Sequence, residues 1–325
     1  RQRQMCIRDS PSIYLWCAQN EPTHNRHMLG PLLAAALKAA DPTRPVKEAS
    51  DFREHPYPGW YWGHLRDFLA LPGAPLPSEF GAQALPRAEL LRRVLGEAAW
   101  PPRWEVYSYH NFQPHETFRV AGVEVGESLE EFVERSQAYQ ARLLEFAVHA
   151  YRRAKGKVVG YFQFLLVEPW EGITWAVVDV ERVPKKGYFA LKEASSPVLL
   201  SLVPFRERLE VGGPPLMEAW LVNDLPRPLK LRVHLRLEGE VGLELWQGEV
   251  ALEAGEVRRV FHLMEAWEAP LEVQAGLAPL QEALGSLPPG AYRLVGEAWE
   301  EERLWSRQEV ALEYLLPLLP RGAAW

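Results

Sequence analysis

Two glutamates stand at the ends of short apolar runs, where side chains of this type could do chemistry. Glu21 follows the run 12–17, and Glu79 lies near the end of the run 76–80. Parallel strands place their C-terminal ends at one edge of a sheet, where barrel enzymes carry their reacting groups. One carboxylic acid that donates a proton and one carboxylate that attacks carbon form the pair needed for glycoside hydrolysis. The alternative is that both are ordinary loop residues among the 43 acidic residues of the chain.

Other groups of polar residues indicate less. Glu21, His24 and His27 spell E-x-x-H-x-x-H, but di-metal sites in helix bundles need two facing Glu-x-x-His pairs. We therefore expect loop residues there and no metal. The sequence holds neither of the glycine-rich phosphate-binding motifs. The basic pair Lys185-Lys186 is interpreted as a solvated helix end.

The first part of the chain alternates strand-like and helix-like segments, which predicts βα units and a parallel sheet. The expected strands are Ser12–Cys17, Pro45–Ser50, Leu76–Phe80 and Lys157–Val167. The expected helices are Met28–Ala40, Tyr61–Leu71, Pro86–Ala98, Glu127–Lys155 and Lys185–Ser195. Ser128 and Glu131 form a capping box at the start of the longest one. Residues 100–126 show little periodicity and are expected to be a long connection.

The pattern changes after Pro197. Leucine and valine alternate strictly with charged residues from Leu229 to Leu237, which is typical of a half-buried antiparallel strand. Similar runs recur at Met217–Val222, Leu243–Trp246, Val257–Leu263, Tyr292–Ala298 and Leu304–Leu312. Short strands at this density predict a β-sandwich. We therefore expect two domains, 11–200 and 201–325.

The first ten residues, RQRQMCIRDS, have no clear period and lack the order of a signal peptide. From Pro11 onward the sequence is apolar, as is typical of a strand inside a folded protein. We therefore expect 1–10 to be a foreign segment in front of a truncated protein. The compartment stays open, with the cytoplasm favoured.

The composition limits the kinds of molecule that the chain is expected to bind. A formal net charge of -7 argues against a general nucleic-acid binder, and no apolar run is long enough to predict a membrane span. Cys6 and Cys17 are too few for a disulfide scaffold. Thirteen tryptophans favour a sugar-binding surface, because indoles stack on sugar faces, or else they are large core residues.

Five segments, in order, carry a resemblance to a known family. PSIYLWCAQNEP, from Pro11, resembles the acid/base segment of glycoside hydrolase family 2, and PSEFGAQALP, from Pro77, resembles its nucleophile segment. DPTRPVKEAS and EHPYPGWYWG, which lie between them, and the stretch 160–202 are similar to further segments of that family. The likeness covers 11–202 and continues more weakly into the start of the family's C-terminal sandwich.

The resemblance implies roles for single residues. Glu21 matches the general acid/base, and Glu79 matches the nucleophile. Asn20 matches the asparagine that bonds the sugar 2-hydroxyl. The family retains anomeric configuration, so the two carboxyl groups should lie about 5–5.5 Å apart.

Four more residues are candidates for the substrate site. Trp16 could form its floor or be a buried barrel residue. His55 and Tyr57 match the family's His-Tyr segment, and Tyr57 could hold Glu79 ionised through a hydrogen bond. Trp170 could stack on the sugar or only pack.

The last strand departs from the β-mannosidase branch, which usually reads W-Q-x-N-D-x-W-P. Phe164 and Val167 stand where that branch has tryptophan and asparagine, while Trp170 is kept. The β-mannosidase branch is favoured by the words SEFGAQ, and the β-galactosidase and β-glucuronidase branches stay open.

The resemblance implies an α/β fold: the C-terminal half of a (β/α)8 TIM barrel, about strands four to eight, followed by an immunoglobulin-like β-sandwich. A barrel cannot close with five strands, so we expect exposed apolar edges. The implied activity is that of a retaining exo-β-glycosidase acting on an oligosaccharide or β-glycoside, with no cofactor. The alternatives are a non-catalytic carbohydrate-binding fragment and a broken reading frame without activity of its own. Oligomeric state, sugar and linkage stay open.

Overall fold

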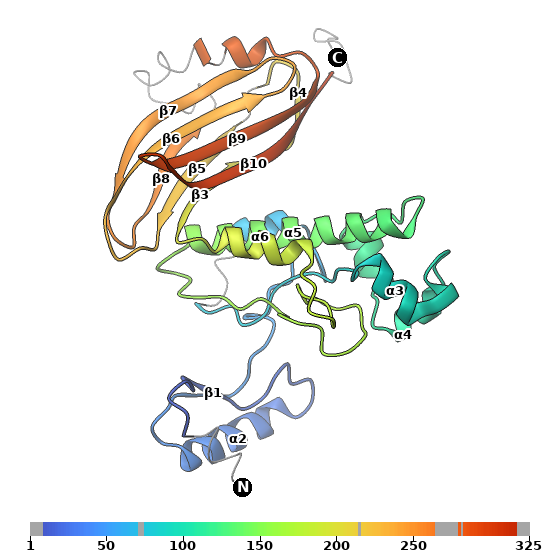
Figure 1. Ribbon diagram of the computed structural model, residues 1–325. Coiled ribbons are helices and arrows are strands. Elements are labelled where there is room, and N and C mark those ends of the chain that lie inside the picture. The colour runs from blue at the N-terminus through green and yellow to red at the C-terminus, as the bar shows by residue number, and fades with distance from the viewer. Residues whose placement is uncertain (1–8, 71–74, 214–215, 264–278, 281, 317–325) are drawn as a thin grey trace, which may run out of the picture. The chain divides into compact units, whose positions relative to one another are not determined.

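The structure is a computed structural model that describes residues 9–70, 75–213, 216–263, 279–280 and 282–316 (Figure 1). The chain divides into two compact units, 1–191 and 192–325. The expected mixture of helices and sheets is confirmed. The expected foreign segment 1–10 lies almost wholly outside the described residues. No helix among the described residues is long and apolar enough to cross a membrane.

The first unit begins with a small βαβ arrangement. Strands β1 (Trp16–Cys17) and β2 (Val46–Lys47) pair in parallel, and helix α2 (Arg26–Ala40) connects them. Both strands are shorter than expected, although an isolated bridge between Asn20 and Ser50 continues their pairing. Apolar side chains are exposed on and before the helix: Tyr14, Leu15, Met28, Leu29, Leu32 and Leu33.

The expected strands 76–80 and 157–167 are not strands in the structure. The two segments run together, and Val159 N–H and Phe162 N–H donate to the carbonyls of Pro75 and Pro77 over 2.7 and 2.9 Å. A regular ladder needs donors on both sides, and proline has no N–H. Pro75 and Pro77 can accept these hydrogen bonds but cannot donate any in return. No strand ladder therefore forms between the two segments.

Helices form most of the rest of this unit. The structure has η1 (Leu65–Leu69), α3 (Ala88–Leu95), η2 (Gly96–Ala98), α4 (Trp104–Tyr109), the π-helical turn η3 (Glu116–Val120), α5 (Leu129–Arg153) and α6 (Lys186–Ala194). Ser128 Oγ accepts from Glu131 N–H at the start of α5, but the Glu131 carboxylate bonds Glu127 N–H instead of the cap residue. Of the two hydrogen bonds expected for the capping box, only the one from Glu131 N–H to the Ser128 hydroxyl is therefore present.

Residues 100–126 were expected to be a long connection with little periodicity, but the structure has α4 and η3 there. α4 and η3 form there because their aromatic rings share one core. Trp104 stacks on Phe112 with ring centroids 5.8 Å apart, and Phe118 stacks on Phe132 of α5 at 6.1 Å. Burial of aromatic rings substitutes here for a periodic sequence pattern.

The second unit consists of two facing sheets. β6 (Leu229–Glu238) and β7 (Leu243–Leu252) join β9 (Gly290–Glu300), β10 (Arg303–Leu315) and β4 (Arg208–Glu210) in the order β4-β10-β9-β6-β7. The second sheet has the order β3-β5-β8, from β3 (Val198–Pro204), β5 (Met217–Asn223) and β8 (Val257–Leu263). All six strands expected after Pro197 are confirmed, and β3 and β4 are additional.

The two sheets share one apolar core, and a glycine sets how closely they approach. A Cβ on Gly296 of β9 would lie 2.8 Å from Leu200 Cδ2 and 3.0 Å from Leu202 Cδ2, both on β3 of the other sheet. Its φ is unremarkable, so the residue is needed for space and not for backbone freedom.

Candidate active site

Glu21 lies in the segment that follows β1, and the main chain of Ser50 holds it in place. Ser50 N–H donates to Gln19 O over 3.0 Å, and Glu21 N–H donates to Ser50 O over 2.8 Å. Glu21 has φ 45°, a left-handed conformation that is uncommon for a residue with a side chain. Its side chain is 56% exposed, so the carboxyl group is open to a bound molecule.

Glu79 is held by the main chain of Glu54. The carbonyl of Glu54 accepts from Ser78 N–H over 2.8 Å and from Glu79 N–H over 3.2 Å. The Glu79 side chain is only 18% exposed. The two glutamates therefore differ in environment, one open to solvent and one largely covered.

His55 brings the two glutamates together. Its Nδ1 lies 2.8 Å from Glu21 Oε1 and 3.6 Å from Glu79 Oε2. One oxygen of each glutamate and a nitrogen of His55 all lie within 4.8 Å of one another. The imidazole is 2% exposed, so both carboxyl groups approach the same edge of a buried ring.

Opposing influences act on the pKa of Glu79. Desolvation raises the pKa of its carboxyl group, and the charge of Glu21 adds to this. His55 and the hydroxyl of Tyr57, which donates over 3.0 Å, act to lower this pKa. The net direction is upward, so Glu79 takes up a proton at higher pH than an ordinary glutamate.

No protein-family model matches the chain. A β-mannosidase B of Aspergillus niger is 28% identical over 188 residues, which are 53% of this chain and 22% of that protein. The β-mannosidase B of Emericella nidulans is 28% identical over 178 residues, 50% of this chain and 21% of that protein. The chain thus spans about a fifth of the length of these curated relatives.

Solved structures show the same fold over nearly the whole chain. A β-D-mannosidase from Dictyoglomus thermophilum has TM-score 0.70 at 18% identity, covering 96% of this chain and 40% of that one. The exo-chitosanase CsxA of Amycolatopsis orientalis has TM-score 0.64 at 17% identity, covering 94% and 37%. The chain is thus similar to β-mannosidases in sequence over about half of its length, and to a solved β-D-mannosidase in fold over nearly all of it.

The other residues expected to contact the substrate differ in how far they are buried and in their neighbours. Asn20 is exposed and next to Glu21. Trp16 is half-buried, and its indole N–H donates to Asp41 over 2.8 Å. Trp170 stacks on His110, with ring centroids 5.5 Å apart, and is 42% exposed. A role for each of them in binding sugar stays a prediction.

An aromatic group beside Glu79 includes a residue that sequence reasoning missed. Trp175 lies 6.5 Å from Tyr57, 6.1 Å from Tyr61 and 5.7 Å from Phe164, measured between ring centroids. Its indole N–H is buried and has no partner among the described residues. The signal was available, because Trp175 falls in the stretch 160–202 that carries the family resemblance.

Glu21, His55 and Glu79 are also the residues that could hold a metal ion, since each directs one ligand atom into the group. Ligands at about 2.0–2.2 Å from a tetrahedral zinc lie roughly 3.3–3.6 Å apart. The 2.8 Å between His55 and Glu21 is a hydrogen-bond distance. The spacing therefore fits proton exchange better than shared coordination. Neither His24 nor His27 belongs to a metal-like group within the described ranges.

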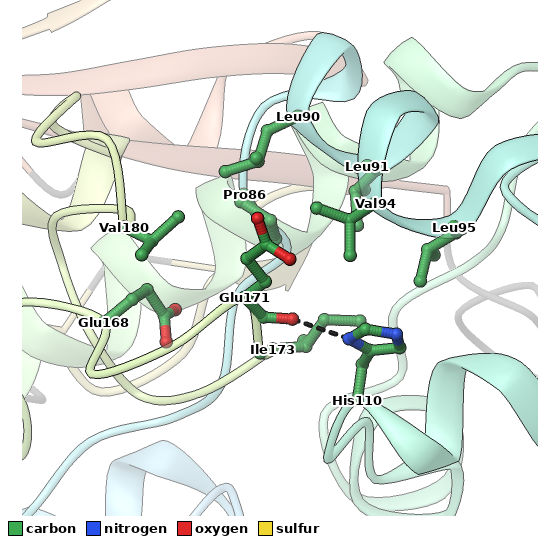
Figure 2. A pocket seen from close by; sticks show the side chains of 11 residues that line it. Pro86, Leu90, Leu91, Val94, Leu95, His110, Glu168, Glu171, Ile173 and Val180 are labelled. Carbon is green, nitrogen blue, oxygen red and sulfur yellow. Dashed lines mark hydrogen bonds between the residues drawn. The ribbon is translucent and has the colours of Figure 1, made fainter.

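A pocket also lies beside α3, lined by Leu90, Leu91, Val94, His110, Glu168 and Glu171, among others (Figure 2). His110 Nδ1 donates to the carbonyl of Glu171 over 2.6 Å. Glu168 is not available as a free acid there, because Lys185 Nζ lies 2.7 Å from it and Thr174 Oγ1 donates to it over 2.6 Å.

Lys185 corrects an expectation from the sequence. It was interpreted as solvated, yet both its side chain and that of Glu168 are 1% exposed. Lys185 Nζ also donates to Ala84 O over 2.8 Å. A buried carboxylate partner makes burial of a lysine tolerable, whereas the neighbouring Lys186 is exposed, as expected.

Proposed function

We propose that the chain carries the catalytic pair of a retaining exo-β-glycosidase, with Glu21 as acid/base and Glu79 as nucleophile. The observation that carries this proposal is the meeting of both carboxyl groups at His55, with an oxygen from each within 4.8 Å. Retaining glycosidases hold the pair about 5–5.5 Å apart, whereas inverting ones leave about 6.5–9.5 Å for a water molecule. The short separation supports double displacement.

The difference in exposure suits the two roles. Glu21, which is open to solvent, gives its proton to the glycosidic oxygen. The bond between this oxygen and the anomeric carbon breaks while an oxygen of Glu79 bonds to the same carbon. A water molecule then passes a proton to Glu21 and attacks the same carbon, which breaks the bond to Glu79. Two inversions at one carbon leave the configuration unchanged.

The fold and the specificity belong to the same proposal. The first unit corresponds to the C-terminal half of a (β/α)8 barrel, and the second to an immunoglobulin-like sandwich. The match to the β-D-mannosidase fold over 96% of the chain supports this reading. The names of the curated relatives favour a terminal β-mannosyl group as substrate, with Asn20 bonding the sugar.

Hydrolysis of a panel of 4-nitrophenyl β-glycosides tests the proposal. We expect β-mannoside to be the preferred substrate and Glu79→Gln to abolish turnover. Glu97→Gln is the matched control, because Glu97 is exposed on η2. Hydrolysis that survives Glu79→Gln would contradict the assignment.

Azide distinguishes the two glutamates. Added azide should rescue Glu21→Ala with a β-glycosyl azide as product, because it attacks the glycosyl–enzyme intermediate. It should rescue Glu79→Ala with an α-glycosyl azide, because it replaces the nucleophile. The opposite products would exchange the two roles. Sugar binding without hydrolysis of any glycoside would favour the carbohydrate-binding alternative.

A further inference from the structure

The hydrogen bonds behind His55 determine where its ring protons lie. Lys47 Nζ forms an ion pair with Glu54 Oε1, which favours an ionised Glu54 carboxylate that can only accept hydrogen bonds. Ser50 Oγ lies 2.7 Å from the other oxygen of that carboxylate. The single hydroxyl hydrogen of Ser50 therefore points at Glu54.

Ser50 Oγ has two further neighbours, His55 Nε2 at 3.1 Å and Ser78 Oγ at 2.8 Å. Because its own hydrogen is directed to Glu54, Ser50 accepts from both of them. A hydroxyl oxygen has two lone pairs, so two acceptor bonds complete its capacity. Ser78 is thus a donor in this contact, and His55 carries a hydrogen on Nε2.

The opposite nitrogen, Nδ1, faces Glu21 Oε1 at 2.8 Å and Glu79 Oε2 at 3.6 Å. A neutral imidazole with its hydrogen on Nε2 presents a bare nitrogen at this edge. Two bare acceptors do not form a 2.8 Å hydrogen bond, so one proton lies between Nδ1 and Glu21. It is bound either to Glu21 or to His55.

We propose that Ser50, oriented by Glu54, is a positioning residue that locks hydrogen onto His55 Nε2, so that the His55–Glu21 contact stores the proton that Glu21 delivers to the leaving group. The arrangement of hydrogens follows from the contacts, and the use of the stored proton rests on the proposed function. The charged groups around the ring are Glu21 and Glu79 at Nδ1 and, beyond Ser50, Glu54 with Lys47. Tyr57 adds a hydroxyl at Glu79.

The relevant side chains can be changed without loss of the main-chain supports. Ser50 holds Glu21 through its backbone N–H and C=O, and Glu54 holds Glu79 through its backbone C=O. Ser50→Ala and Glu54→Gln therefore change the hydrogen bonds to His55 and keep the backbone bonds at both glutamates.

Glu54→Gln should reverse the tautomer of His55. The introduced amide would turn its oxygen toward Lys47 and its NH₂ group toward Ser50. Ser50 would then accept from the amide, and its own hydrogen would turn to His55 Nε2. The ring hydrogen would move to Nδ1 and point at an ionised Glu21. Glu48→Gln is the matched control, since Glu48 is exposed on the same segment and outside this network.

The tautomer can be measured without turnover. Two-bond ¹H–¹⁵N correlation NMR of the full chain with ¹⁵N-labelled histidine distinguishes bare from protonated ring nitrogens, and a His55→Asn spectrum assigns the signals. We expect protonated Nε2 in the unmodified chain and in Glu48→Gln, and a neutral ring with hydrogen on Nδ1 in Glu54→Gln. Ser50→Ala should shift the population in the same direction. A neutral ring with bare Nε2 in the unmodified chain, or no change in both Glu54→Gln and Ser50→Ala, would overturn the proposal.

Kinetics test the role of the stored proton. In Glu54→Gln, kcat for aryl glycosides with poor leaving groups should fall about 10- to 100-fold, while dinitrophenyl glycosides, which need little proton donation, change little. The basic limb of the pH profile should move to lower pH, because the hydrogen on Nδ1 displaces the stored proton from the His55–Glu21 contact. If Glu79→Gln leaves hydrolysis intact, the proposed function fails whatever the tautomer. If hydrolysis needs Glu79 but the basic limb stays unchanged in Glu54→Gln, the inference alone fails.

Discussion

The hydroxyl of Tyr57 lies 3.0 Å from Oε2 of Glu79 and donates a hydrogen bond to it. Burial raises the pKa of this hydroxyl, and the neighbouring carboxylate raises it further, so Tyr57 stays protonated and remains a donor. Such a bond favours the ionised form of the acceptor. It therefore stabilises the carboxylate that a nucleophile must be.

Tyr57→Phe should shift the acid limb of the pH profile of kcat/KM to higher pH. Glu79 already has a raised pKa, and activity grows as pH rises through that value because the nucleophile must be ionised. Loss of the donor raises the pKa further. Hydrogen bonds to charged groups contribute about 1.5–3 kcal/mol, so kcat/KM on the acid limb should fall roughly 10- to 100-fold. An acid limb that stays in place or moves to lower pH would disprove the role of Tyr57.

Glu21→Gln should have an effect that depends on the leaving group. General acid catalysis contributes about 10²- to 10⁴-fold, so hydrolysis of glycosides with basic leaving groups should fall by that factor. Formation of the glycosyl–enzyme intermediate from dinitrophenyl glycosides should change little. Loss of the Glu21 charge should also lower the pKa of Glu79, because that charge raises it. Rapid-mixing measurement of dinitrophenol release checks both effects, and equal losses with all leaving groups would contradict them.

Lys185→Met should destabilise the first unit strongly. It leaves the Glu168 carboxylate buried without its ion-pair partner, a change that costs about 3–5 kcal/mol in free energy of unfolding. Lys186→Met is the matched control on the next residue, where exposed Lys186 pairs with Glu134 and the loss should be about 0–1 kcal/mol. Urea unfolding measures both losses. Similar losses in the two variants would show that the buried pair stabilises the unit no more than the exposed pair does.

Gly296→Ala should destabilise the second unit by about 1–3 kcal/mol, the usual cost of overpacking. The added methyl group would press on Leu200 and Leu202 across the two sheets. Gly242→Ala serves as control, because its Cβ would have no neighbour closer than 3.9 Å. Thermal unfolding of both variants provides the comparison, and an unaffected Gly296→Ala would mean that the sheets can move apart freely.

The fold was predictable where one local rule decided the outcome. Alternation from Leu229 to Leu237 matched β6, because one face of that strand is buried. Ser128 marked the start of α5, because its hydroxyl caps the helix. The segments 76–80 and 157–167 failed as strands, because Pro75 and Pro77 interrupt the ladder in a way that apolar content does not reveal.

The sequence by itself determined which residues were candidates: Glu21 and Glu79 in motifs of the right order, with Tyr57 assigned to Glu79 in advance. Only the tertiary structure decided what surrounds them. Ser50, Glu54 and Trp175 lie in segments that carry the family resemblance, but nothing in those segments indicated that they surround the glutamates. Lys185 looked like a surface residue until Glu168 was found beside it. The physical reason is that a motif records residue type and spacing along the chain. Burial, hydrogen-bond direction and proton position depend on partners that only the folded chain brings within about 3 Å.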